Sequence, residues 1–128
     1  MSLATRAVTV MLPVDDVDRA KKFYVESLEL SYTGTNDEGS AIFELAGGTT
    51  LMLLPRPGGK RSEATAISWE ADDVEAAVNE LQGKGVAFED YDFPGLKTVD
   101  HIATMEGEKA AWFKDPDGNV LCVHQTSS

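Results

Sequence analysis

The stretch VDDVDRA at residues 14–20 returns as ADDVEAA at residues 71–77, so that Asp16 corresponds to Asp73. Each copy follows an apolar, β-rich stretch and opens a helical pattern of apolar residues. An aspartate ahead of such a pattern is a typical helix N-cap, because its carboxylate accepts amide hydrogens that the first turn leaves without partners. The two copies therefore indicate an internal duplication with one strand-to-helix junction in each half.

The second part of each half also matches. The stretch AIFELAGGTTLMLL at 41–54 aligns without gaps on AWFKDPDGNVLCVH at 111–124, so that Gly48 corresponds to Gly118. The number of residues between equivalent positions is larger in this second match than the number between Asp16 and Asp73 in the first. The second half must therefore carry an insertion between its helix and its last hairpin, and we place this insertion near residues 92–108.

Local signals give both halves the same order of elements. In the first half, Val17, Ala20, Tyr24 and Leu28 form one helical stripe. In the second half, Asp72 with Glu75 resembles a capping box, and Gly83 and Gly85 end the helix. The predicted strands of the first half are 8–14, 30–35, 41–45 and 49–54, and those of the second half are 66–71, 86–91, 109–114 and 119–124.

The DPDG stretch at residues 115–118 is a turn signal. Pro116 presets φ for a turn and Gly118 accepts a positive φ. We therefore interpret this motif as structural and not as a phosphate-binding loop.

Size and charge limit the possible functions. At 128 residues and 42% hydrophobic composition, the chain forms one domain, residues 1–128, with one core. The net charge of −11 excludes nucleic-acid and anionic-membrane partners, which need clustered Lys and Arg. This acidity favours a neutral or cationic small molecule, or it serves solubility alone.

The cysteine count and the termini favour the cytoplasm. Cys122 is the only cysteine, so no intrachain disulfide forms, and no signal-like leader opens the chain. No apolar run approaches the roughly 20 residues that span a bilayer.

With LPVDDVDRAKKFY at 12–24 and WFKDPDGNVL at 112–121, the duplicated order resembles the vicinal oxygen chelate superfamily. This superfamily includes glyoxalase I, extradiol dioxygenases, fosfomycin-resistance enzymes, methylmalonyl-CoA epimerase and bleomycin-binding resistance proteins. The resemblance implies an α+β fold of tandem βαβββ modules, here 6–57 and 64–126, that form a curved half-barrel with an internal cavity. It also implies a homodimer, with the cavity completed within one chain or across two.

Enzymes of this superfamily hold a divalent metal through up to four His, Gln or Glu side chains. The corresponding positions here are Thr9, Met52, Ala66 and Cys122. None supplies the anionic oxygen or imidazole nitrogen that a divalent ion needs. We therefore expect neither a metal nor another cofactor.

Other residues offer alternative chemistry. Cys122 and His124 share a strand face, with Met52 expected across from them; these soft ligands suit Cu(I) or Zn, or they pack as ordinary core residues. His101, next to Asp100, suits a general base, or it is a loop histidine. The candidate catalytic residues are therefore His101, His124 and Cys122.

The strand alternation, together with the resemblance, predicts which residues line the cavity. Trp112 either offers a stacking face to a ligand or fills the core, whereas Trp69 points the opposite way, toward the helix. The segment 93–97 covers the cavity or is only a long connection. The predicted lining residues are Thr9, Met11, Met52, Ala66, Ser68, Glu70, Trp112, Cys122 and His124.

These observations favour a metal-independent small-molecule-binding protein with a resistance or sequestering role. The alternative is a glyoxalase- or dioxygenase-type lyase, isomerase or oxygenase that uses displaced metal ligands or acid/base residues. A ligand-sensing or scaffolding module is a third class. No motif narrows the identity of the ligand.

Overall fold

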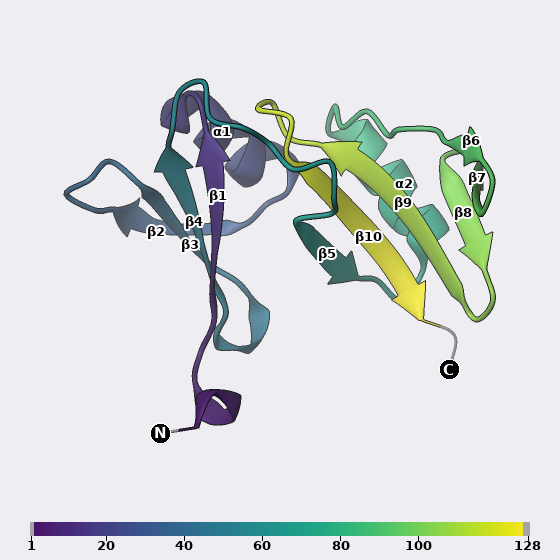
Figure 1. The fold of residues 1–128 in the computed structure, drawn as a ribbon, viewed down its shortest axis with the longest axis horizontal. Coiled ribbons are helices and arrows are strands. Elements are labelled where there is room, and N and C mark those ends of the chain that lie inside the picture. The colour runs from purple at the N-terminus through teal and green to yellow at the C-terminus, as the bar shows by residue number, and fades with distance from the viewer. Residues whose placement is uncertain (1, 127–128) are drawn as a thin grey trace. The chain divides into compact units, whose positions relative to one another are not determined.

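The computed structural model describes residues 2–126 and divides the chain into two compact units. The first unit is Met1–Arg61 and the second is Ser62–Ser128. Each unit contains its own sheet and its own helix (Figure 1). The α+β fold predicted from the sequence is confirmed.

The first unit is a four-stranded sheet in the order β1-β4-β3-β2. β1 and β4 run parallel, and the other neighbours are antiparallel. Its elements are η1 (Leu3–Thr5), β1 (Thr9–Val14), α1 (Val17–Lys22), η2 (Phe23–Ser27), β2 (Ser31–Thr35), β3 (Ala41–Glu44), η3 (Ala46–Gly48) and β4 (Thr50–Pro55).

The second unit is a six-stranded sheet in the order β5-β10-β9-β8-β7-β6. β5 and β10 run parallel, as β1 and β4 do in the first unit. Its elements are β5 (Ile67–Glu70), α2 (Val74–Gly83), β6 (Asp92–Phe93), β7 (Leu96–Val99), β8 (Ile102–Met105), β9 (Glu108–Lys114) and β10 (Val120–Thr126).

Both helices begin at an aspartate N-cap. Asp16 accepts a hydrogen bond from the Arg19 amide at 3.2 Å, and Asp73 accepts one from the Ala76 amide at 3.2 Å. The predicted equivalence of Asp16 and Asp73 is confirmed. The capping box predicted at Asp72 is wrong, because Asp73 is the cap.

The carboxylate of Glu75 pairs instead with Lys109 on β9 at 2.8 Å. This hydrogen bond lowers the pKa of Glu75 and raises that of Lys109. The residue expected to cap the helix therefore joins the helix to the sheet.

The strand registers reproduce both sequence matches. In the first unit Met11 lies opposite Met52, which lies opposite Ile42. In the second unit the row is Ser68, Cys122 and Trp112, which are the residues that the two matches make equivalent to Met11, Met52 and Ile42. The two sheets are thus built on one frame.

The insertion changes the strand that follows the second helix. The strand predicted for 86–91 reduces to a single bridge between Phe88 and Phe113. In the sheet order, β8 occupies the position that β2 has in the first unit, so β6 and β7 are additional strands. The alternating apolar residues Val86 and Phe88 are buried without forming a strand, which explains the wrong prediction.

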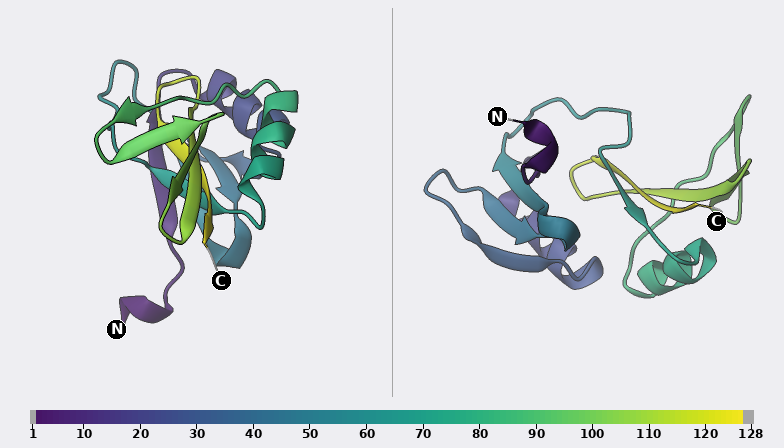
Figure 2. Two further views of the ribbon diagram at one scale, coloured as in Figure 1. Left: turned by 90° about the vertical axis from the view of Figure 1, so that its right-hand side faces the viewer. Right: turned by 90° about the horizontal axis from the view of Figure 1, so that it is seen from below.

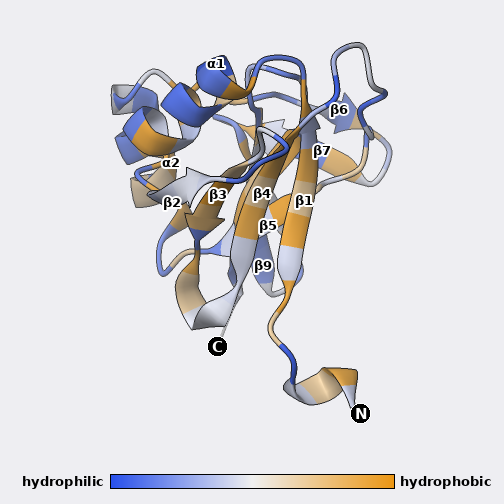
Figure 3. Cartoon of the chain, turned by 90° about the vertical axis from the view of Figure 1, so that its left-hand side faces the viewer, coloured by the Kyte–Doolittle hydropathy of each residue, from blue (hydrophilic) through white to orange (hydrophobic). Residues whose placement is uncertain are grey.

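Each helix covers one face of its own sheet. Tyr24 of the first helical segment and Phe43 of β3 are fully buried with ring centroids 6.0 Å apart. In the second unit Val74 of α2 and Phe113 of β9 are fully buried. Figure 2 shows α2 alongside β9 and β10, and Figure 3 shows the apolar character of β1 and β4 against the polar exterior of α1.

The first helix continues in π geometry. The Leu28 amide donates to the Phe23 carbonyl at 3.2 Å, five residues back. The apolar stripe predicted here is compatible with either helix type, so this change could not be predicted from it.

The DPDG turn is structural, as predicted. The Asp115 carboxylate accepts from the amides of Asp117 and Asn119, each at 2.9 Å, and from the Asn119 side chain at 2.8 Å. Gly118 has a φ of 87°.

Among residues 2–126, no helix combines the length and apolar character that membrane crossing requires.

Candidate functional site

The two units present very different side chains in their equivalent central rows. In the first unit Met11 is 56% exposed, Met52 is half-buried, and Thr9 lies exposed at the start of β1. The row of the first unit is therefore apolar, with two thioethers and the aliphatic side chain of Ile42.

The second unit combines polar, thiol and aromatic groups in the same row. Ser68 on β5 is exposed, Cys122 on β10 is buried, and Trp112 on β9 is half-buried. Register places these three residues side by side across the strands. Ala66 lies two residues before Ser68, just before β5 begins, and its side chain is exposed.

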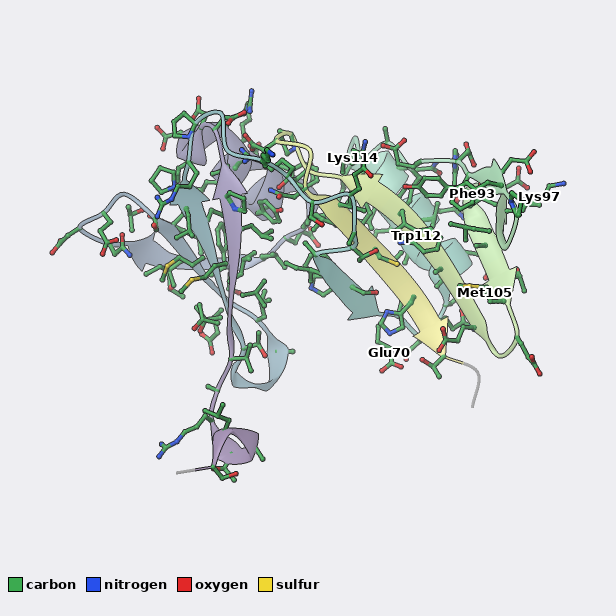
Figure 4. All side chains as sticks on the ribbon, in the orientation of Figure 1. Glu70, Phe93, Lys97, Met105, Trp112 and Lys114 are labelled. Carbon is green, nitrogen blue, oxygen red and sulfur yellow. The ribbon has the colours of Figure 1, made fainter. Side chains whose placement is uncertain are left out.

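The next row of the second sheet contains Glu70, His124 and Ala110. Glu70 is exposed, His124 is half-buried and Ala110 is small and buried. Residues two apart on a strand share a face, so His124 lies on the same face as Cys122. Figure 4 shows Glu70 near the end of β5 and Trp112 midway along β9.

Aromatic side chains at the start of the insertion and just before it pack beside Trp112. Tyr91 meets the Trp112 ring edge to face, with centroids 5.6 Å apart and an interplanar angle of 79°. Phe93 contacts Tyr91 at 5.9 Å and is 52% exposed. The Trp112 Nε1–H donates to the Thr65 hydroxyl at 3.0 Å, which fixes the indole. We call this surface the Trp112 face: Ser68, Glu70, Tyr91, Phe93, Trp112, Cys122 and His124.

Two of these contacts were not predicted from the sequence. Thr65 and Tyr91 lie outside regular strands, and their approach to Trp112 depends on how the two loops fold. The alternation of aromatic residues in YDF, residues 91–93, was the available signal for Tyr91 and Phe93.

Hydrogen bonds connect the polar residues of the Trp112 face. The Ser68 hydroxyl lies 2.5 Å from His124 Nδ1, and the Cys122 thiol donates to the Val123 carbonyl at 3.4 Å. Burial raises the pKa of Cys122, although hydrogen bonds from Ser68 and from the Ala111 backbone act in the opposite direction. The thiol is therefore protonated at neutral pH, which is the form of a packing residue and not of a nucleophile.

Burial also raises the pKa of Tyr91, and the negative charge of Glu89 acts in the same direction. The phenol is therefore neutral at physiological pH. Tyr91 contributes an uncharged ring beside Trp112.

His101 occupies a tight turn between β7 and β8. Val99 pairs with Ile102, and Asp100 and His101 have φ values of 52° and 73°, as a type I′ turn requires. His101 Nδ1 lies 3.0 Å from Asp90 Oδ2 but without hydrogen-bond alignment, so the contact is an ion pair only when the ring is protonated. The Phe88 ring lies 6.3 Å from the His101 ring.

Trp69 lies on the alternate positions of β5, between Ser68 and Glu70. It is half-buried, whereas both neighbours are exposed. The two tryptophans therefore occupy opposite faces of the second sheet.

Two surface hollows lie elsewhere. One of about 420 Å³ is bordered by α1 and η2 of the first unit, and one of about 210 Å³ lies at the β8–β9 turn. Neither is lined by the predicted cavity residues.

A family model described as the Glyoxalase/Bleomycin resistance protein/Dioxygenase superfamily matches residues 6–123. The chain belongs to this superfamily. The match covers both strand-helix junctions and the DPDG turn.

Several solved structures resemble the chain over nearly its whole length. TnmS3, an antibiotic binding protein from Streptomyces sp. CB03234, is 27% identical with a TM-score of 0.68, covering 99% of this chain and 100% of its own. A glyoxalase/bleomycin resistance protein from the same organism is 29% identical with a TM-score of 0.60, covering 94% and 100%. Lactoylglutathione lyase from Agrobacterium tumefaciens shares the fold at 20% identity and a TM-score of 0.66, covering 94% and 93%. No curated protein matches the sequence.

The superfamily metal does not fit the residues present. Thr9, Met52, Ala66 and Cys122 stand at the positions where the resemblance predicts the metal ligands, and the only sulfhydryl among them is buried with a raised pKa. Within residues 2–126, no three His, Cys, Asp or Glu side chains are grouped closely enough to hold a metal ion.

Proposed function

We propose that this member of the superfamily is a metal-independent small-molecule-binding protein whose ligand contacts the Trp112 face. One observation carries the proposal: Trp112 is half-buried, fixed by Thr65 and flanked by Tyr91 and the exposed Phe93. Aromatic rings supply apolar area and stacking surfaces that a planar ligand can use.

Charge and similarity support the same class of ligand. The net charge of −11 attracts cations and disfavours anions. The relative TnmS3 is described as an antibiotic binding protein, which supports a sequestering or resistance role for this chain. We further propose that the protein acts in the cytoplasm as a homodimer.

Tryptophan emission tests the proposal, with 9-aminoacridine as a planar cationic probe. Wild type and Trp69→Phe should show quenching with similar affinity, because Trp69 lies on the other face. Trp112→Phe should lose most of the signal and some affinity. Quenching that follows Trp69 instead, or no binding to wild type, would contradict the proposal.

The hydrogen bond between Ser68 and His124 favours a second function, acid/base catalysis without a metal. Formation of lactoylglutathione from methylglyoxal and glutathione tests it. In a catalyst, alanine at His124, Cys122 or His101 should abolish turnover, and 9-aminoacridine binding should survive in His101→Ala, because His101 lies outside the Trp112 face. The absence of turnover in wild type would exclude this activity.

A further inference from the structure

Side chains of opposite charge lie at the two ends of the Trp112 face. Lys114 is two residues beyond Trp112 on β9, so strand alternation places both side chains on one side of the sheet. Glu70 lies at the end of β5, in the row that contains His124 and Ala110. Both charged side chains are exposed. Figure 4 shows them at opposite ends of the sheet, with Trp112 between them.

The indole of Trp112 extends from β9 toward β5. Its Nε1–H donates to the Thr65 hydroxyl at 3.0 Å. The next residue, Ala66, donates its amide hydrogen to the carbonyl of the first β10 residue at 2.8 Å, on the side of β10 where β5 lies. The ring therefore reaches across β10, which separates the strand of Lys114 from the strand of Glu70.

The spacing of the two charges suits a ligand with two or three fused rings. Lys114 lies four residues beyond Ala110 along β9, and β5 is the second strand from β9. The Cα atoms of Lys114 and Glu70 are therefore roughly 17 Å apart. Both long side chains extend over part of this distance, and the remaining gap matches a fused ring system with one charged group at each end.

Lys114 can accept an anionic ligand group as a partner. Its ammonium lies 3.7 Å from the Glu89 carboxylate, which is longer than a hydrogen bond. A ligand carboxylate at hydrogen-bond distance gains charge-assisted bonds that Glu89 does not make. An ionised Glu70 offers only acceptors, so it favours a cationic group that donates.

We infer that the ligand of the Trp112 face is an aromatic zwitterion, with its anionic group at Lys114 and its cationic group at Glu70. This inference rests on the proposed function and names the ligand class. The net charge of −11 repels an anion that carries no cationic group. Lys114 supplies the local positive charge that makes the anionic end favourable.

Three matched compounds test the two charges separately. The parent compound is 6-(aminomethyl)-2-naphthoic acid; its methyl ester lacks the negative charge, and its N-acetyl derivative lacks the positive charge. Calorimetry at low ionic strength should show wild type binding the parent about three- to fivefold more tightly than either derivative, because each derivative loses one ion pair. Equal affinities for the parent and either derivative would overturn the inference.

Neutral variants assign each charge to a residue. Lys114→Gln should remove the preference over the methyl ester, and Glu70→Gln should remove the preference over the N-acetyl derivative. Lys97→Gln and Glu108→Gln are the matched controls and should keep both preferences. Lys97 is exposed on the opposite face of the second sheet, and Glu108 is exposed at the far end of β9 (Figure 4). A control that removes either preference would overturn the assignment.

A charge swap tests the assignment through a gain of binding. The double variant Lys114→Glu with Glu70→Lys keeps the net charge, and the parent compound can bind it with its ends reversed. Each single reversal should bind the parent more weakly than wild type, and the double variant should restore the preference over both derivatives. A double variant that has the stability of wild type but shows no such preference would overturn the inference.

Failure of the proposed function has a different signature. In that case none of the three compounds binds in a Trp112-dependent manner, and Trp112→Phe leaves any heat of binding unchanged. If Trp112→Phe instead weakens all three compounds while the parent has no advantage, the proposed function stands and the zwitterion assignment is overturned.

Discussion

The two sheets share a strand frame but differ in the chemistry that they display. The row Met11, Met52 and Ile42 of the first unit becomes Ser68, Cys122 and Trp112 in the second, at unchanged register. Only the second row contains hydrogen-bonding side chains and an aromatic ring. The two units therefore have the same strand pairing. The side chains at three equivalent positions differ, so the surface is apolar in the first unit and polar and aromatic in the second.

Substitutions in the buried core should have the largest effect on stability in both units. Phe43 and Phe113 are equivalent in the alignment of the two halves and are both fully buried. Phe43→Ala and Phe113→Ala should each lower the free energy of unfolding by about 3–5 kcal/mol, through lost burial and a cavity. Urea denaturation measures both. A cost below about 1 kcal/mol for either variant would show that the two cores are not equivalent.

Substitutions in the equivalent turns of the two units should differ in their effect on stability. The Asp115 carboxylate accepts hydrogen bonds from the amides of Asp117 and Asn119 and from the Asn119 side chain. The side chain of its counterpart Leu45 can accept none, and the turn there is closed by the Leu45 amide donating to the Thr49 carbonyl at 2.7 Å. Asp115→Asn should cost about 2 kcal/mol of unfolding free energy, because the acceptor loses its charge. Leu45→Asn serves as the matched control. A smaller loss at Asp115 than at Leu45 would contradict the role of the carboxylate.

The helix caps should behave alike. Asp16→Ala and Asp73→Ala each remove one side-chain acceptor at 3.2 Å, so each should cost about 1 kcal/mol. Asp18→Ala, within the first turn of α1 and not at the cap, should cost less. Thermal denaturation measures the three variants, and a difference above about 1 kcal/mol between the two caps would break the equivalence.

The smallest effect concerns Cys122, which the first unit lacks. Because burial raises its pKa above the ordinary value of 9.0, the stability that the protonated thiol contributes is present below pH 9 and is lost as pH rises toward the folded-state pKa. Unfolding free energies of wild type and Cys122→Ala, measured between pH 7 and 10, should converge with rising pH. In addition, iodoacetamide at pH 8 should modify the folded chain more slowly than the urea-unfolded chain. Equal modification rates would show that the thiol is not protected.

The repeat itself was the strongest sequence signal. The correspondences between Asp16 and Asp73, and between Met52 and Cys122, were sufficient to predict both strand-helix junctions and the pairing of the last hairpins. They reveal these features because equivalent backbone positions need the same cap and the same alternation.

Other features depend on contacts that no local pattern encodes. The π segment after Lys22 differs from an α-helix by one residue of hydrogen-bond spacing, which an apolar stripe does not report. The prediction of a strand from Val86 onward was wrong, because buried residues that do not pair with a strand can show the same alternation of apolar and polar residues as a strand. Thr65 and Tyr91 reach Trp112 through loop geometry, so their role required the structure.

The insertion extends one edge of the second sheet. β6 pairs with β7, β7 with β8, and β8 joins the duplicated frame through β9. Residues around Pro94 and Gly95 can therefore lengthen, shorten or change sequence without altering the register of β9 and β10. Under the proposed function, sequence changes confined to this hairpin should alter which ligands bind beside Trp112, while the free energy of unfolding stays close to that of wild type.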